Sequence, residues 1–231
     1  MPSPMLRKVF LSSLICVSAA LVGAAAGPPA APSLKFEEVI RRVADTQKKT
    51  RTLEATFRQD KVSSMLAEPD TSTGTFLFSA PNKVLWTYQR PKPVTMLIAD
   101  GWLTTYYPQL ARAERVEVRR FEDRIFRYMG AVGAIDELAR YFHFKFVDPR
   151  KERFYRLELK PRTSIVARRV KAITIWIDRE TFVTSKFEYA EADGDVTRYE
   201  FTNIKRNAAV PAARFTLKLP SSVKVEQMKI N

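Results

Sequence analysis

The chain has 231 residues, 45% of them hydrophobic and 28% charged, and its 39 basic residues exceed its 25 acidic residues to give a net charge of +14. A single cysteine excludes an internal disulfide, so a hydrophobic core must stabilise the fold, and the length suffices for one large domain. Seven glycines in the whole chain argue against a glycine-rich loop for a phosphate-bearing cofactor.

The basic residues occur as scattered pairs and form no dense tail. Such a surface can attract nucleic acid, anionic lipid headgroups or an acidic protein, or it can simply be solvated. Export from the cytoplasm would argue against nucleic acid, so the N-terminal sequence bears on this choice.

Residues 1–26 have the layout of a secretory signal peptide. Arg7 and Lys8 precede an apolar run, and Ala24 and Ala26 are spaced as a cleavage site. The alternative is a retained membrane anchor, but the run is shorter than the roughly 20 residues that a spanning helix needs. We therefore expect cleavage after residue 26, and export.

Cys16 raises a lipoprotein signal as a further possibility. Ile15 precedes it, whereas such signals place a small residue there, so we interpret Cys16 as an apolar residue of the signal peptide. The domain organisation expected is a signal peptide at 1–26, a linker at 27–33 and a single domain at 34–231.

The first element expected in this domain is an amphipathic helix over residues 34–49. Phe36, Val39, Ile40 and Val43 recur at helical spacing, and Ser33 is expected to cap the N-terminus.

From Thr52 onward the hydrophobic period changes to two, which is typical of strands. Turn residues such as Gly74, Asp100-Gly101 and Asp193-Gly194 separate the runs, so an antiparallel sheet curled into a barrel or half-barrel is expected. The alternating sets are Phe76 and Phe78; Val84, Trp86 and Tyr88; Tyr155, Leu157 and Leu159; Ile173, Ile175 and Ile177; Phe187 and Tyr189; and Phe215, Leu217 and Leu219.

One stretch within the β region has helical spacing instead. Apolar residues repeat every three or four positions from Phe121 to Met129 and again from Ile135 to Phe142, with Gly130 and Gly133 between. This spacing predicts two short amphipathic helices, whose apolar faces must be buried. The concave face of the sheet is the nearest large apolar surface, so we expect a helical lid over it.

The sequence offers little for catalysis. His143 is the only histidine, no cysteine remains in the mature chain, and no nucleophile elbow or cluster of metal ligands is present. The carboxylate pairs at 37–38 and 122–123 are expected on helix surfaces among arginines. The prediction is a protein without enzymatic activity, metal or cofactor.

Aromatic and methionine side chains are the positive feature of the composition. They suit a cavity that accepts flexible chains, because aromatics offer large apolar area and methionine adapts its shape. They suit a plain hydrophobic core equally well, so composition leaves both interpretations open.

A series of short motifs extends along nearly all of the predicted domain. The motifs are Phe57-Arg58-Gln59, Gly74, Pro81-Asn82, Trp86 with Tyr88, Pro91 and Pro93, Met96 to Gly101, Tyr106-Tyr107-Pro108, Ala212 to Phe215, and Pro220. Each motif is weak alone, but in their order and spacing they resemble LolA, the periplasmic carrier family that ferries lipoproteins to the outer membrane.

The resemblance implies a mainly β (α+β) fold, an incomplete antiparallel β-barrel closed by an N-terminal helix and a short helical lid. It implies a monomeric periplasmic carrier without cofactor whose cavity takes the acyl chains of triacylated lipoproteins. The implied partners are the Lol ABC transporter in the inner membrane and the outer-membrane receptor LolB. The residues expected to line the cavity are Phe76, Phe78, Val84, Trp86, Tyr88, Met96, Ile98, Tyr106, Ile125, Met129, Ile135 and Leu138.

Two positions depart from the family pattern. Ala80 stands where the family commonly has an arginine that latches the lid, a role that Arg124 or Arg127 could take over. Val84 stands where an aromatic residue is frequent. We also expect that glutamate in place of Val84 or Phe78 abolishes cargo binding and leaves the fold intact.

Three other functions remain open from the sequence. The same fold could carry free lipid or glycolipid, or sense lipid. A lipid hydrolase is a weaker alternative, because the sequence offers no histidine-based catalytic group. A nucleic-acid binder rests on charge alone and conflicts with export.

Overall fold

The fold is seen in a computed structural model in which residues 34–63, 65, 67–119 and 135–228 are described. These residues all belong to one compact unit, Pro32–Asn231.

Among the described residues, twelve strands form a single sheet in the order β12-β6-β5-β4-β3-β2-β1-β11-β10-β9-β8-β7. Neighbouring strands are antiparallel except β12 and β6, which are parallel. The order begins and ends on different strands, so the sheet is open, as an incomplete barrel requires. The strands are β1 (Thr52–Val62), β2 (Asp70–Ser79), β3 (Lys83–Arg90), β4 (Val94–Ala99), β5 (Trp102–Tyr107), β6 (Arg112–Glu117), β7 (Phe142–Val147), β8 (Phe154–Pro161), β9 (Val170–Asp178), β10 (Thr184–Glu191), β11 (Val196–Arg206) and β12 (Lys224–Met228).

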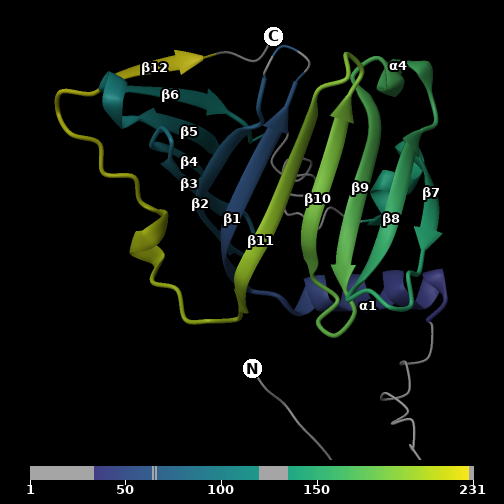
Figure 1. Cartoon of the computed structure of the whole chain (residues 1–231). Helices are drawn as coiled ribbons and strands as arrows, with labels where there is room; N and C mark the ends of the chain where they lie inside the picture. The colour runs from purple at the N-terminus through teal and green to yellow at the C-terminus, as the bar shows by residue number, and fades with distance from the viewer. Residues whose placement is uncertain (1–33, 64, 66, 120–134, 229–231) are drawn as a thin grey trace, which may run out of the picture. The chain divides into compact units, whose positions relative to one another are not determined.

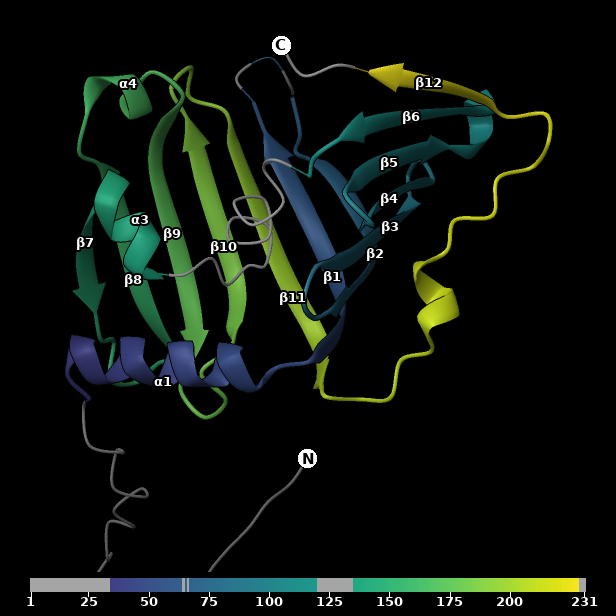
Figure 2. The same ribbon diagram turned by 180° about the vertical axis from the view of Figure 1, so that it is seen from behind.

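The helical elements are short apart from the first. In Figure 2, α1 crosses one end of β7 to β10, and α3 lies over the same half of the sheet. Strand direction rotates from β7 to β12, so that β6 and β12 run across the view in Figure 1 while β10 and β9 run steeply. The elements are α1 (Phe36–Lys49), α3 (Ile135–Tyr141), α4 (Ser164–Ala167), η1 (Pro108–Leu110) and η2 (Ala212–Phe215).

Helix α1 confirms the predicted amphipathic helix but starts two residues later than expected. Its N-cap is Lys35, whose side chain makes no capping bond, so the prediction of a Ser33 cap was wrong. Acidic residues in the first turn and basic residues in the last turn complement the helix dipole instead. Val39 and Val43 are fully buried, which orients the helix on the sheet.

Helix α3 confirms the second of the two predicted short helices. Leu138 is 8% exposed and packs beside Phe142, which is the first residue of β7. The first predicted helix lies outside the described residues.

The apolar face of the sheet carries two hydrophobic clusters. The helix-covered cluster joins residues of α1 and α3 to β7, β8 and β9, with Leu157, Leu159 and Ile177 fully buried. The aromatic cluster is centred on Phe57, Phe76, Trp86 and Phe201. Cross-strand pairs from Leu157 to Ile175, Ile175 to Phe187, and Phe187 to Tyr199 connect the two along one face.

The opposite face carries a smaller cluster, in which Phe215 of the C-terminal segment packs on Leu77, Leu97 and Ala99. The segment after β11 crosses this face and forms η2 on the way to β12 (Figure 1). The prediction of a strand through Phe215, Leu217 and Leu219 was therefore wrong. These residues alternate because Phe215 and Leu217 point into the sheet surface, while the backbone has no neighbouring strand among the described residues.

Candidate functional site

The aromatic cluster is built from residues of eight neighbouring strands, from β6 to β10 in the order of the sheet. The Phe57 ring lies 4.9 Å from that of Trp86 and 5.0 Å from that of Tyr88, both edge-on. Phe76 meets Trp86 at 4.7 Å and Phe201 at 5.9 Å. Aromatic pairs favour such edge-to-face contacts, so the rings form an ordered apolar surface.

Gly74 makes this arrangement possible. A Cβ at Gly74 would overlap the carbonyl oxygen of Thr87 and lie 2.8 Å from Cε1 and Cζ of Phe57. Only glycine therefore lets the Phe57 ring lie over β2 and reach Tyr88, which pairs directly with Gly74 in the register.

A second group of rings extends the surface across β10 and β11. Phe187 stacks on Tyr199 at 4.6 Å, and Trp86 meets Tyr199 edge-on at 5.5 Å. Burial raises the pKa of the Tyr199 hydroxyl, and the Tyr88 hydroxyl 3.4 Å away raises it further. Burial likewise raises the pKa of Tyr88, so both phenols stay neutral at physiological pH.

Two buried polar atoms on this face have no hydrogen-bond partner in the described part of the chain. They are Nε1 of Trp86 and Oγ1 of Thr197, whose residues are 6% and 1% exposed. Burying a donor without a partner costs about 1–3 kcal/mol. A ligand with a carbonyl or ester oxygen could accept from either atom.

Seven of the twelve predicted cavity residues come together in the aromatic cluster. Phe76, Val84, Trp86 and Ile98 are at most 6% exposed, and the other three are partly buried beside them. The seven are Phe76, Phe78, Val84, Trp86, Tyr88, Met96 and Ile98. Their role in binding stays a prediction.

Of the remaining five, Tyr106 and Leu138 lie outside the cluster. Tyr106 pairs with Thr95, whereas Met96 and Ile98 alternate onto the other face, so Tyr106 faces away from the aromatic cluster. Leu138 belongs to the helix-covered cluster. Ile125 and Met129 lie outside the described residues, as does the side chain of Ile135.

The burial of Val84 corrects one expectation. Its side chain is 0% exposed between Phe78 and Ile98 in the register, so a glutamate there would bury an unpaired charge. Val84→Glu is therefore expected to disrupt the fold. Phe78 is only partly buried and remains suitable for the experiment.

The predicted set omitted Phe57, Tyr199 and Phe201, which are central to the cluster. Each alternates correctly with its neighbours along its own strand. What was missing from the sequence is that β1 lies between β2 and β11.

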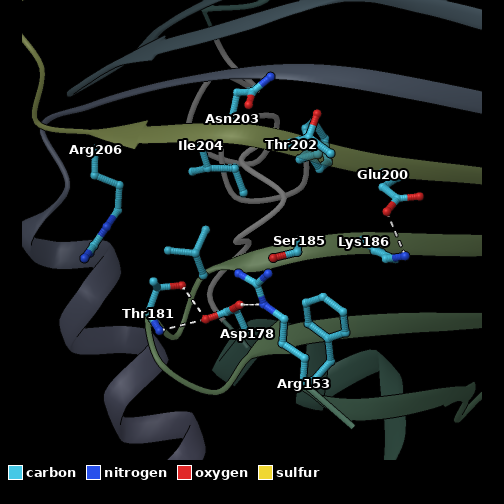
Figure 3. A pocket seen from close by; sticks show the side chains of 13 residues that line it. Arg153, Asp178, Thr181, Ser185, Lys186, Glu200, Thr202, Asn203, Ile204 and Arg206 are labelled. Carbon is cyan, nitrogen blue, oxygen red and sulfur yellow. Dashed lines mark hydrogen bonds and ion pairs between the residues drawn. The ribbon is translucent and has the colours of Figure 1, made fainter.

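Two cavities lie along β10 and β11, and neither is lined by a residue of the predicted set. The first has a volume of about 320 Å³ and opens where the β10–β11 pairing ends at Lys186 and Glu200. Figure 3 shows Asp178 and Arg153 on one side of it and Thr202 and Asn203 on the other. The second, about 310 Å³, is lined by charged residues such as Arg58 and Glu188 together with Phe187 and Tyr199.

Asp178 is the buried charge beside the first cavity. It accepts hydrogen bonds from the backbone of Glu180 and Thr181 and from the Thr181 hydroxyl, and Arg153 pairs with it at 2.6 Å. Burial alone would raise the pKa of Asp178, but the Thr181 amide and Arg153 together hold that pKa below its ordinary value. The bonds from Glu180 and Thr181 close the turn after β9, and Arg153 ties this turn to the start of β8, so we interpret Asp178 as structural.

The described residues hold no group of three or more histidine, cysteine, aspartate or glutamate side chains that could bind a metal. His143 is exposed on β7, opposite Lys160 of β8. No described helix is long and apolar enough to cross a bilayer. The chemistry offered by the aromatic cluster is that of apolar binding.

Comparison with known proteins agrees with this geometry. Residues 48–218 match the family described as "Outer membrane lipoprotein carrier protein LolA". The chain belongs to this family. An outer-membrane lipoprotein carrier protein of Leptothrix cholodnii is 29% identical over 176 residues, which cover 75% of this chain and 78% of the relative. That of Bordetella avium is 29% identical over 175 residues, covering 74% and 79%.

Solved structures share the fold at low identity. An uncharacterized conserved protein from Thermus thermophilus superposes with a TM-score of 0.55 at 10% identity, covering 83% of this chain and 98% of that one. The MucA/MucB complex of Pseudomonas aeruginosa gives a TM-score of 0.51 at 16% identity, covering 78% and 60%. The fold of this LolA-family protein is thus shared by proteins of very different sequence.

Proposed function

We propose that this LolA-family protein binds the acyl chains of lipoproteins on its aromatic cluster and carries them through the periplasm to the outer membrane. The observation that carries the proposal is the cluster itself. Phe57, Phe76, Trp86, Tyr199 and Phe201 gather on one face of an open sheet, with neutral phenols and no ion pair among them.

The energetics of such a carrier favour exchange over tight storage. Each methylene moved from water to an apolar site gains about 0.8 kcal/mol, so long acyl chains do not stay in water. A membrane offers them a similarly apolar environment, and transfer between membrane and protein is nearly balanced. Loading from an inner-membrane Lol ABC transporter and release to a LolB receptor fit this balance.

A polar atom of Trp86 can orient the cargo. An acyl chain carries its ester or amide carbonyl at one end, and Nε1 of Trp86 is a buried donor without a partner among the described residues. A hydrogen bond between them would fix how deeply the chain enters. We therefore assign Trp86 both an apolar contact and a polar one.

The proposed location follows from the same role. Removal of residues 1–26 on export would leave a periplasmic protein of one domain that acts as a monomer. Mass spectrometry of the protein from its native host tests the cleavage, since the mature N-terminus should lie at Gly27.

The function is tested by adding the purified protein to spheroplasts and assaying outer-membrane lipoproteins in the supernatant. The wild type should release them as a soluble complex, and Phe78→Glu should not, because a carboxylate on the apolar face repels acyl chains. Thr75→Glu is the matched control: it places the same charge on the same strand, on the opposite face. It should release lipoproteins as the wild type does.

Other outcomes identify other functions. Absence of release, with free lipid co-purifying from the native host, would replace lipoprotein carriage with a free-lipid carrier or lipid sensor. Equal release by wild type and Phe78→Glu would move the binding site away from the aromatic cluster.

A further inference from the structure

The tip of the sheet at α4 combines an exposed aliphatic side chain with unpaired positive charge. Residues 160–171 join β8 to β9 and include five basic residues and no acidic one. In Figure 2 this tip lies at the end of the strands away from α1. None of these residues is a buried member of the three hydrophobic clusters, although Val166 and Val170 pack against the helix-covered cluster.

Ile165 projects from the tip with 75% of its surface exposed. The α4 turn holds it there: the Thr163 side chain accepts from the Val166 amide, and the Ala167 amide donates to the Thr163 carbonyl at 3.0 Å. Val166, by contrast, packs against the helix-covered cluster. The turn therefore directs Ile165 outward and the next residue, Val166, inward.

The cations around Ile165 are not neutralised within the described structure. Lys160, Arg162, Arg168, Arg169 and Lys171 are all exposed, and none takes part in an ion pair between described residues. Several basic residues elsewhere are paired: Arg41 and Arg42 share Glu38, and Arg198 pairs with Glu188.

Acidic residues do approach from one neighbour. Glu191 ends β10, Asp193 and Asp195 lie in the turn that follows, and the Ala192 amide of this turn donates to the Arg169 carbonyl at 3.3 Å. The five cations of the tip outnumber these three carboxylates.

The tip is also anchored. The Arg162 amide donates to the Tyr141 carbonyl at 2.8 Å, and its Nε donates to the carbonyls of Ala139 and Phe142 at 2.9 and 3.0 Å. These bonds attach the tip to the C-terminal end of α3, where Tyr141 is 40% exposed. The partly exposed, amphipathic side chain of Tyr141 therefore lies beside the tip.

We propose that the α4 tip docks this protein on membranes rich in anionic phospholipid, with Ile165 entering the headgroup region and the surrounding cations contacting lipid phosphates. Charge complementarity argues for lipid: basic residues near an anionic bilayer each add attraction, and an aliphatic side chain adds burial. A protein partner fits less well, because a stable interface needs about 800 Å² on each partner, whereas the tip is one protruding turn.

The test is sedimentation of the protein with vesicles of equal parts phosphatidylcholine and phosphatidylglycerol, and with vesicles of phosphatidylcholine alone. The wild type should bind the anionic vesicles and lose that binding in high salt. The triple variant Arg168→Gln/Arg169→Gln/Lys171→Gln should bind about 100-fold more weakly, and Ile165→Ser about 10-fold more weakly.

A matched triple variant controls for net charge. Lys48→Gln/Lys49→Gln/Arg51→Gln removes three exposed charges near the end of α1, at the other end of the sheet, and should bind anionic vesicles as the wild type does. Thermal unfolding of each variant checks that it is folded. All proteins carry the same N-terminal segment, so differences between them report the tip.

Equal losses in the two triple variants would overturn the proposal in favour of general charge attraction. Absence of wild-type binding to anionic vesicles would also overturn it, and the basic tip would then be assigned to an acidic protein partner. The vesicles contain no lipoprotein, so this result is independent of whether the protein carries lipoproteins.

Discussion

The two halves of the apolar face are closed in different ways. Over β7 to β9 the chain covers its own sheet, as Val39 and Val43 of α1 and Leu138 of α3 pack onto Leu157 and Leu159. In the aromatic cluster every described member comes from a strand or from Val118 just after β6. The first half is covered by helices that pack on its strands, and the second is filled by aromatic rings that pack on one another. Under the proposed function, the first half supplies stability and the second supplies binding.

The strongest test of this division concerns a position where the two roles conflict. Val84 belongs to the aromatic cluster but is fully buried, so Val84→Glu should cost about 4 kcal/mol or more through its unpaired charge. Urea unfolding followed by circular dichroism measures the loss. A folded Val84→Glu protein of wild-type stability would mean that this part of the cluster opens readily to solvent.

A pair of truncations separates stability from binding. Leu157→Ala and Phe76→Ala each remove a buried side chain, and each should cost about 3 kcal/mol. Uptake of a fluorescent fatty acid by the folded fraction should fall only in Phe76→Ala, because Leu157 lies under the helices. Loss of uptake in both variants would show that the halves act as one site.

Asp178 tests how the helix-covered half is held at its edge. Asp178→Asn keeps an acceptor for the turn amides but loses the charged bond to Arg153, and should cost about 2 kcal/mol near neutral pH. The folded state lowers the pKa of Asp178, so its contribution is full above the unfolded value of about 3.9 and is lost as pH falls further. Urea titrations between neutral and acid pH should show that the free energy of unfolding falls less at acid pH in the variant than in the wild type. An equal fall in both proteins would mean that other groups cause the acid sensitivity.

The smallest effect is expected on the charged face of β10 and β11. Arg198→Gln removes the ion pair with Glu188, and the Arg198 side chain is 60% exposed. Exposed pairs contribute less than about 1 kcal/mol, so stability and fatty-acid uptake should both stay near the wild-type values. A large change in uptake would extend the binding site to this face.

The sequence predicted the face of each strand well where one side was clearly more apolar than the other. Val84, Trp86 and Tyr88 alternate with Leu85 and Thr87, and the structure places the first three together. In β5 both faces carry large side chains, so the alternation could not decide where Tyr106 points. Its face depends on the pairing set by the turn at Asp100 and Gly101, through which Ala99 pairs with Trp102.

Two further features could not be predicted from the local sequence pattern, because they depend on which segments are neighbours in the folded chain. Phe57 and Tyr199 meet because β1 and β11 are neighbours, and strand order is a property of the whole chain. Phe215 and Leu217 alternate as a strand would, yet they pack across strands instead of pairing with one. Alternation reports which side chains are buried, and a partner strand must be found separately.

The pairing of β1 with β11 also sets the order in which this protein can be finished. Thr56 bonds Thr202 across the middle of the sheet, although 146 positions separate them in the chain. A polypeptide made from its N-terminus therefore holds β1 without one of its two neighbours until nearly all of it has been synthesised. Contacts so distant in sequence slow folding. Such a delay would keep the chain unfolded long enough to be threaded through a secretion channel, as the proposed export requires.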